Sequence, residues 1–206
     1  ALKNLVQTSQ DDLQLMDRNI KAGIQRLKNF QTPEGAISMW PGEYSYYSEW
    51  CTNYAGHFLI EAQKKGYELP IGFLPQWKKF QKKRALEWTA NDNTSNDAVQ
   101  AYRLYTLALA GIPELGAMNR LKEMLSISLT SKWILAGAYI LAGQLAVATS
   151  IVNNLGSNVV YKAGYYSQIN YGSHTRDKAM ILEVMAQLGD LQKALPLAKE
   201  LSAKLS

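Results

Sequence analysis

The chain of 206 residues contains one cysteine, Cys51, so it cannot form an internal disulfide bond. It contains only two histidines, which are too few for a histidine-rich metal site, and no metal or cofactor is expected. Only six prolines interrupt the chain, which leaves long stretches free to form helices. The richest apolar run, 133–148, is shorter than the roughly 20 residues of a membrane span. Insertion of this segment into a membrane is therefore not expected.

The chain has a small positive net charge. The net charge of +5 permits contact with an acidic surface, but it does not require a nucleic-acid partner. With 47% hydrophobic and 19% charged residues, the composition is that of a globular protein with a sizeable core.

Apolar residues recur at steps of three and four along much of the chain, which predicts amphipathic helices. The helices expected first along the chain cover about 13–27, 48–66, 74–88 and 97–110. Ser48 is a suitable N-cap for the second helix, and Gly66 is a suitable C-terminal stop.

A repeated pattern follows, in which a helix ends in glycine and a helix containing alanine comes next. The three copies are 107–111 followed by Ala117, 139–143 followed by Ala148, and 185–189 followed by Ala194. Glycine ends a helix in a left-handed turn, and small residues allow helices to approach closely. The pattern predicts an all-α array of antiparallel helical hairpins.

Two long loops rich in glycine and aromatic residues, 31–48 and 162–173, each precede a helix. Simple solenoids usually have short turns, so these loops favour an α/α toroid with both loops on one face. We interpret their aromatic side chains as a plug in the mouth of the toroid. Alternatively, they contact a neighbouring domain, because Tyr and Trp are enriched at interfaces. The candidate binding residues are Trp40, Tyr44, Tyr46, Tyr47, His57, Tyr165, Tyr166 and Tyr171.

Three blocks carry a resemblance to a known family. Residues 27–42 read LKNFQTPEGAISMWPG, residues 50–67 read WCTNYAGHFLIEAQKKGY, and residues 171–182 read YGSHTRDKAMIL. In order and spacing they resemble the thioester domain of bacterial alpha-2-macroglobulins. The Gln-x-Pro-x-Gly and Gly-Ser-x-x-Arg-Asp elements make the resemblance specific, and it covers nearly the whole chain.

The resemblance implies a toroid of inner and outer helices in a protein that traps proteases. In that family, cleavage of a bait segment exposes an internal thioester that acylates the protease. The thioester motif Cys-x-Glu-Gln does not occur here, because Thr52, Asn53 and Tyr54 follow Cys51. The resemblance places that motif before Ala1 and a further helix pair after Ser206. Residues 1–206 would then be one helical domain, the central part of an incomplete ring.

The resemblance also implies partners and a location. The partners would be the other domains of the parent protein and, through it, the target proteases. The location would be the periplasm or the cell surface. The expected role is a non-catalytic module of a protease-trapping protein, and no enzymatic activity is expected.

Candidate chemistry in the chain is sparse. Cys51 is interpreted as a buried structural residue, since His57 lies six positions away on another face of the helix. The basic cluster is interpreted as a solvated helix face, because no exposed aromatic residues alternate with it as they do in nucleic-acid readers. It comprises Lys78, Lys79, Lys82, Lys83 and Arg84.

Arg176 and Asp177 are predicted to hold structure. Asp177 would accept backbone N–H groups in the first turn of a helix, and Arg176 would tie down the preceding loop.

Two other classes of function stay open. A tetratricopeptide-like scaffold would bind a peptide, but its strict period of about 34 residues is absent. A toroid enzyme acting on a glycan or an isoprenoid would require clustered acidic residues, which the sequence does not provide.

Overall fold

The computed structural model describes residues 9–89, 97–158 and 172–204. Within these ranges the chain is mostly helical, with one small two-stranded sheet. Its elements are α1 (Gln10–Lys28), β1 (Ser38–Trp40), β2 (Glu43–Tyr47), α2 (Glu49–Lys64), α3 (Phe73–Glu87), α4 (Asp97–Leu109), α5 (Leu115–Lys122), α6 (Leu129–Leu141), α7 (Leu145–Val152), α9 (His174–Leu188) and α10 (Leu191–Ser202).

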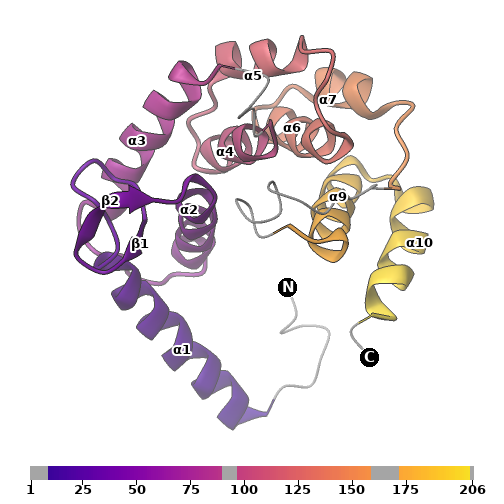
Figure 1. Ribbon diagram of the computed structural model, residues 1–206. Coiled ribbons are helices and arrows are strands. Elements are labelled where there is room, and N and C mark those ends of the chain that lie inside the picture. Colours follow the sequence, from indigo (N-terminus) through magenta and orange to yellow (C-terminus); the bar gives the residue numbers. More distant parts are fainter. Residues whose placement is uncertain (1–8, 90–96, 159–171, 205–206) are drawn as a thin grey trace.

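The helices form two concentric rows. Helices α2, α4, α6 and α9 form the inner row, and α1, α3, α5, α7 and α10 form the outer row (Figure 1). Successive inner helices pack on one another, and the outer helices pack against them. Helices α1 and α10 lie at the two ends of the arc. The predicted all-α fold of paired inner and outer helices in an incomplete ring is confirmed.

A glycine in the left-handed conformation follows each of the four inner helices, at the stops predicted from the sequence. Gly66, Gly111, Gly143 and Gly189 have φ between 72° and 87° after α2, α4, α6 and α9. This conformation satisfies the last carbonyl groups of a helix and turns the chain toward the outer row. Inside that row, the three alanines of the repeat are buried: Ala117, Ala148 and Ala194.

The core consists of two groups of buried side chains. The larger lies around α4 and α6 and includes Leu104, Leu107 and Trp133. The smaller lies between α1, α2 and α3, where Trp77 is fully buried and its indole N–H donates to the carbonyl of Thr52 at 2.7 Å. No helix in the described ranges is both long and apolar enough to cross a membrane.

The predicted long loop 31–48 contains a β-hairpin, which is a correction to the sequence analysis. Strands β1 and β2 pair antiparallel, with Ser38 opposite Tyr47 and Trp40 opposite Glu43. The intervening turn is Pro41-Gly42, and Gly42 has a φ of 75°. Proline followed by a glycine at positive φ is favoured in type II turns. The prediction missed these strands because they are short and depend on each other for hydrogen bonding.

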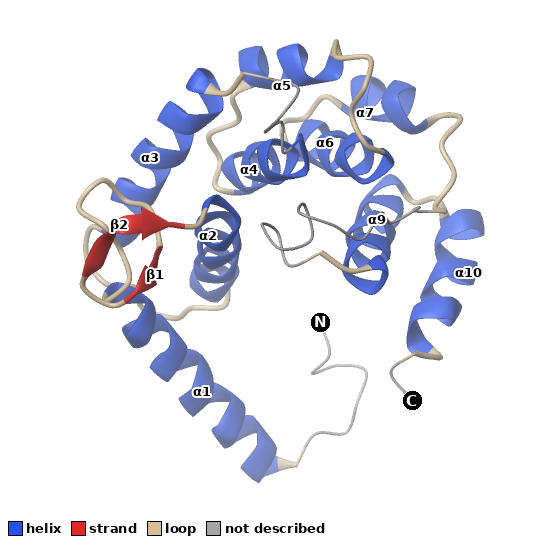
Figure 2. Ribbon diagram, viewed as in Figure 1, coloured by secondary structure: helices blue, strands red, loops and turns tan. Residues whose placement is uncertain are grey.

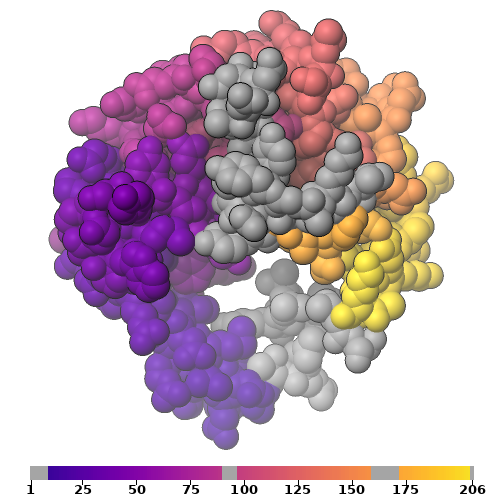
Figure 3. Space-filling model, in the orientation of Figure 1, coloured from indigo at the N-terminus to yellow at the C-terminus, as the bar shows by residue number. Residues whose placement is uncertain are grey.

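The loop before the hairpin docks on α2 and α3. The Gln31 amide donates to the carbonyl of Phe73 at 3.0 Å, and the backbone N–H of Ile37 donates to the Thr52 hydroxyl at 2.9 Å. Gly35 is buried and packs against the backbone of Gln76. In the space-filling view the hairpin, α2 and α3 form one continuous surface (Figure 3).

Candidate functional site

The inner helices enclose a small groove lined by aromatic residues, which we call the central groove. It has a volume of about 150 Å³. Its lining comes from α2, α4, α6 and α9: Trp50, Tyr54, His57, Tyr102, Tyr105, Ile134, Arg176, Met180, Glu183 and Val184. A concave, mostly apolar pocket with a few polar groups is the usual form of a ligand or side-chain binding site.

Helical periodicity places the lining residues of α2, and those of α4, on one face of their helix. Trp50, Tyr54 and His57 are spaced four and three residues apart on α2, and therefore share a face of that helix. Tyr102 and Tyr105 are three apart on α4, and their rings lie 6.4 Å apart. Because α2 and α4 are adjacent inner helices, the two faces meet at the groove.

Two hydrogen bonds connect the polar groups of the central groove. The His57 Nδ1 atom lies 2.8 Å from the Tyr102 hydroxyl, and the Tyr105 hydroxyl donates to Glu183 Oε1 at 2.8 Å. Gln187 donates to the Tyr105 hydroxyl oxygen at 3.4 Å. His57 is thus a hydrogen-bonded residue of the groove.

Burial shifts the pKa values of three of these groups. It lowers the pKa of the His57 imidazole below its ordinary value. Burial also raises the pKa values of the Tyr102 and Tyr105 hydroxyls far above the usual range. At neutral pH the imidazole and both phenols are therefore uncharged. Such groups can stack and exchange hydrogen bonds, but neither tyrosine is activated as a nucleophile.

Arg176 and Asp177 connect α9 to two other inner helices. The Arg176 guanidinium lies 4.3 Å from the centre of the Trp50 ring on α2, and its Nε donates to Asp177 Oδ1 at 2.8 Å. The Thr130 hydroxyl of α6 donates to Asp177 Oδ2 at 3.3 Å. Asp177 lies in the first turn of α9, and the N-cap is Ser173, whose hydroxyl accepts the backbone N–H of Arg176.

Replacing Asp177 with alanine is expected to lower the free energy of unfolding by about 2 kcal/mol, because the Arg176 guanidinium and the buried Thr130 hydroxyl lose a charged acceptor. Chemical denaturation monitored by circular dichroism measures the change. Asp177→Asn keeps the shape and an acceptor for Thr130, so it should lose less. Unchanged stability of Asp177→Ala would contradict a structural role for this pair.

The structure separates the predicted aromatic binding residues into two places. His57 lies in the central groove, whereas Trp40, Tyr44, Tyr46 and Tyr47 are exposed on or beside the hairpin. Figure 2 shows the hairpin at the outer side of the arc, beside α3. These four side chains therefore do not plug the mouth, because the loop folds onto the outer helix. Tyr165, Tyr166 and Tyr171 lie outside the described residues.

Cys51 is also placed differently from the prediction. It is half-buried, and it lines a second cavity of about 590 Å³ together with Trp50, Tyr54 and Phe58. The sequence analysis treated it as buried, but it lies in the first turn of α2, where the helix surface stays open. His57 bonds to Tyr102 in the central groove, and the two residues do not form a nucleophile and base pair.

Three further residues of the central groove, Tyr102, Tyr105 and Glu183, were not predicted from the sequence. The two tyrosines stand in a helix whose other residues are also mostly apolar, so their side of the helix could not be assigned. Their spacing of three residues was the available signal. Among the described residues, no three side chains of metal-binding type lie close enough to hold a metal ion.

Comparison with solved structures gives a likeness to bacterial alpha-2-macroglobulins. The native protein of Escherichia coli, spanning domain MG7 to the C-terminus, matches with a TM-score of 0.76 and 22% identity, over 96% of this chain and 34% of that one. The native conformation of the E. coli protein by cryo-EM matches with a TM-score of 0.72 and 22% identity, over 96% and 14%. Salmonella alpha-2-macroglobulin reacted with methylamine matches with a TM-score of 0.71 and 24% identity, over 87% and 12%.

The sequence matches no protein-family model and no curated protein. At these identities the likeness establishes the fold, which is the one that the sequence blocks implied. The chain spans only 12% to 34% of the length of these three solved chains.

Proposed function

We propose that the chain is a non-catalytic module of an alpha-2-macroglobulin-like protein that traps proteases. The observation that carries this proposal is the match of the double-row arc to the E. coli protein over 96% of the chain. Solved relatives include an E. coli alpha-2-macroglobulin activated by porcine elastase and one activated by trypsin. In this proposal residues 1–206 are one helical domain, the central part of the thioester-type domain, in a protein of the periplasm or the cell surface.

The two sequence elements behind the resemblance support the proposal through their structural roles. Gln31 and Gly35 of the first element dock the hairpin loop on α3. In the second element Ser173 caps α9, Arg176 connects α9 to α2, and Asp177 connects it to α6. Both elements therefore fix the geometry of the arc, and we propose that Arg176 and Asp177 act in structure and not in chemistry.

The module's role would be to present surfaces to the other domains of the parent protein. Exposed aromatic side chains at the hairpin suit such contacts, because Tyr and Trp bury much area and keep a polar group for hydrogen bonding. The parent protein, mixed with trypsin, is expected to retain the protease. Failure to retain trypsin would contradict the proposal.

The isolated chain is expected not to incorporate methylamine covalently. The sequence lacks Cys-x-Glu-Gln, so no glutamine is placed to form a thioester with Cys51. Incubation with radiolabelled methylamine followed by denaturing electrophoresis tests this, with a solved relative that reacts with methylamine, the Salmonella protein, as the positive control. Label retained on this chain would mean that it holds an activated acyl group.

A tetratricopeptide-like interaction scaffold is the second candidate. It would stack its hairpins into an open superhelix, whereas the inner and outer rows here curve into a ring (Figure 1). The curvature therefore favours the macroglobulin-like proposal.

A further inference from the structure

The positive charge of the chain is concentrated on one outer helix. Helix α3 contains five of the 22 Lys and Arg residues but only one of the 17 Asp and Glu residues. The net charge of this helix of 15 residues is thus nearly the +5 of the whole chain. Such a field attracts and orients an acidic partner.

Three of these cationic side chains already have partners within the protein. Lys82 pairs with Glu114 at 2.9 Å, Arg84 donates to Glu49 at 2.8 Å, and Lys78 donates to the carbonyl of Ala110 at 3.0 Å. Two lysines remain available. Lys83 meets Glu87 only at 3.9 Å and its side chain is 71% exposed, and exposed Lys79 makes no ion pair or hydrogen bond with any residue that the structure describes.

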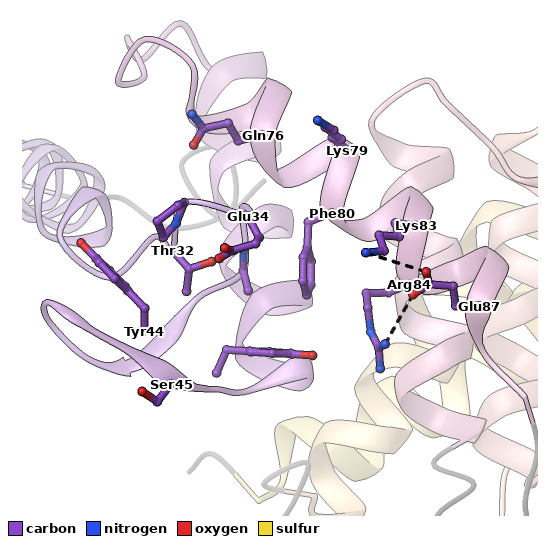
Figure 4. Close-up of a pocket in the computed structure, with 13 residues that line it drawn as sticks. Thr32, Glu34, Tyr44, Ser45, Gln76, Lys79, Phe80, Lys83, Arg84 and Glu87 are labelled. Carbon is purple, nitrogen blue, oxygen red and sulfur yellow. Dashed lines mark hydrogen bonds and ion pairs between the residues drawn. The ribbon is translucent and has the colours of Figure 1, made fainter.

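Beside these two lysines lies a cavity of about 800 Å³, which we call the α3–hairpin groove (Figure 4). Lys79, Phe80, Lys83 and Arg84 line it from α3, and Tyr44 and Tyr47 line it from the hairpin. The rings of Tyr47 and Phe80 meet edge to face, with centres 5.4 Å apart. Tyr44 is 49% exposed, so about half of this residue is open to solvent.

We propose that the α3–hairpin groove binds a short acidic peptide segment of a partner protein, with an aromatic residue between its carboxylates. The carboxylates would meet the ammonium groups of Lys79 and Lys83. The aromatic side chain would pack against Tyr44 and the Tyr47–Phe80 pair. A volume of this size lies in the range of typical ligand sites. The proposal does not depend on the macroglobulin-like function.

The acidic side chains of the groove favour a peptide over a nucleic acid. Glu34 and Glu87 line the same cavity as the lysines. Their carboxylates repel a continuous row of phosphates, whereas a peptide offers backbone N–H groups that can donate to them.

Fluorescence anisotropy with the full chain tests the proposal. The probe is fluorescein-labelled Asp-Glu-Tyr-Glu-Asp amide in about 50 mM salt, where charge effects are strong. The double variant Lys79→Glu/Lys83→Glu is expected to raise Kd about tenfold or more, because two attractive contacts become repulsive. Tyr44→Ser is expected to raise Kd about threefold through loss of the aromatic contact.

The matched control is Lys122→Glu/Lys199→Glu, which makes the same change in net charge at exposed lysines of α5 and α10. Its Kd should stay within about threefold of the unmodified chain, a shift that long-range charge alone explains. An equal loss in both double variants would overturn the proposal, since binding would then reflect net charge. No measurable binding, or equal binding of a Lys-Lys-Tyr-Lys-Lys probe, would also overturn it.

Tighter binding of a single-stranded DNA oligonucleotide would overturn it too, if Lys79→Glu/Lys83→Glu abolishes that binding. The groove would then be assigned to nucleic acid. Circular dichroism verifies that each variant is folded.

Discussion

Replacement of Glu49 by alanine is expected to lower the free energy of unfolding by about 3–5 kcal/mol, since it leaves the charge of Arg103 buried without its counter-ion. The Arg103 side chain is 1% exposed, and its Nη2 donates to Glu49 Oε2 at 2.7 Å. Its remaining donors bond to the side-chain oxygens of Gln81 and Gln100. One guanidinium thus connects α2, α3 and α4, and denaturant unfolding of the variant measures its dependence on Glu49.

Glu87→Ala is the matched control. It also removes a carboxylate that pairs with Arg84, but this one is 49% exposed and its nearest contacts are 3.7 and 3.9 Å long. Its effect should be below about 1 kcal/mol. The double variant Glu49→Leu/Arg103→Met should recover only part of the lost stability. An apolar pair of similar volume needs no counter-ion, but the buried side-chain oxygens of Gln81 and Gln100 lose their donor. A Glu49→Ala variant as stable as Glu87→Ala would show that water compensates the Arg103 charge.

The Glu49 carboxylate also affects the stability of the protein at acid pH. Burial alone would raise the pKa of Glu49, but the charges and hydrogen bonds of Arg103 and Arg84 hold it below the ordinary value of 4.5. A carboxyl group with a lowered folded-state pKa stabilises the protein above its unfolded pKa, and this contribution is lost as the pH falls through the folded pKa. Below about pH 4.5, part of the fall in the free energy of unfolding of the unmodified chain is therefore due to Glu49. Glu49→Ala should lack this part of the fall.

Replacement of Gly35 by alanine is expected to destabilise the protein by about 3–5 kcal/mol, through two costs that add. The φ of Gly35 is 103°, which disfavours any residue with a Cβ. A Cβ at this position would also lie 2.3 Å from the backbone oxygen of Gln76. Backbone atoms of α3 cannot move aside as a side chain can, so the loop must leave the helix. Thermal or denaturant unfolding of the variant measures the loss.

Gly42→Ala separates the two costs. Gly42 also has a positive φ, 75°, but a Cβ there would meet nothing within 4 Å. It should lose only the conformational part, about 1–2 kcal/mol. Equal losses in the two variants would indicate that the contact between Gly35 and α3 contributes nothing. If Gly35→Ala does not fold in buffer, both variants are unfolded in the presence of a stabilising osmolyte. Gly35→Ala must then still be less stable than Gly42→Ala.

The helices and their ends were determined by the sequence, because these features depend on neighbours in the chain. Ser48 caps α2 by accepting the backbone N–H of Cys51, as its position before an apolar pattern predicted. The repeated glycines stop inner helices at the predicted places, and the alanines after them are buried in outer helices. Local hydrogen bonding and helical periodicity suffice for these assignments.

The contacts that make the candidate sites were decided only by the tertiary structure. The basic cluster on α3 has no exposed aromatic neighbours in sequence, yet the hairpin brings Tyr44 and Tyr47 beside it. The central groove joins α2 to α4 and α9, and the hydrogen bond from Tyr105 to Glu183 spans 78 residues. The sequence gives no sign that Arg103 is buried, whereas the packing of three helices buries it. Burial and pairing between distant segments depend on how helices pack, and periodicity within one helix carries no information about its partner.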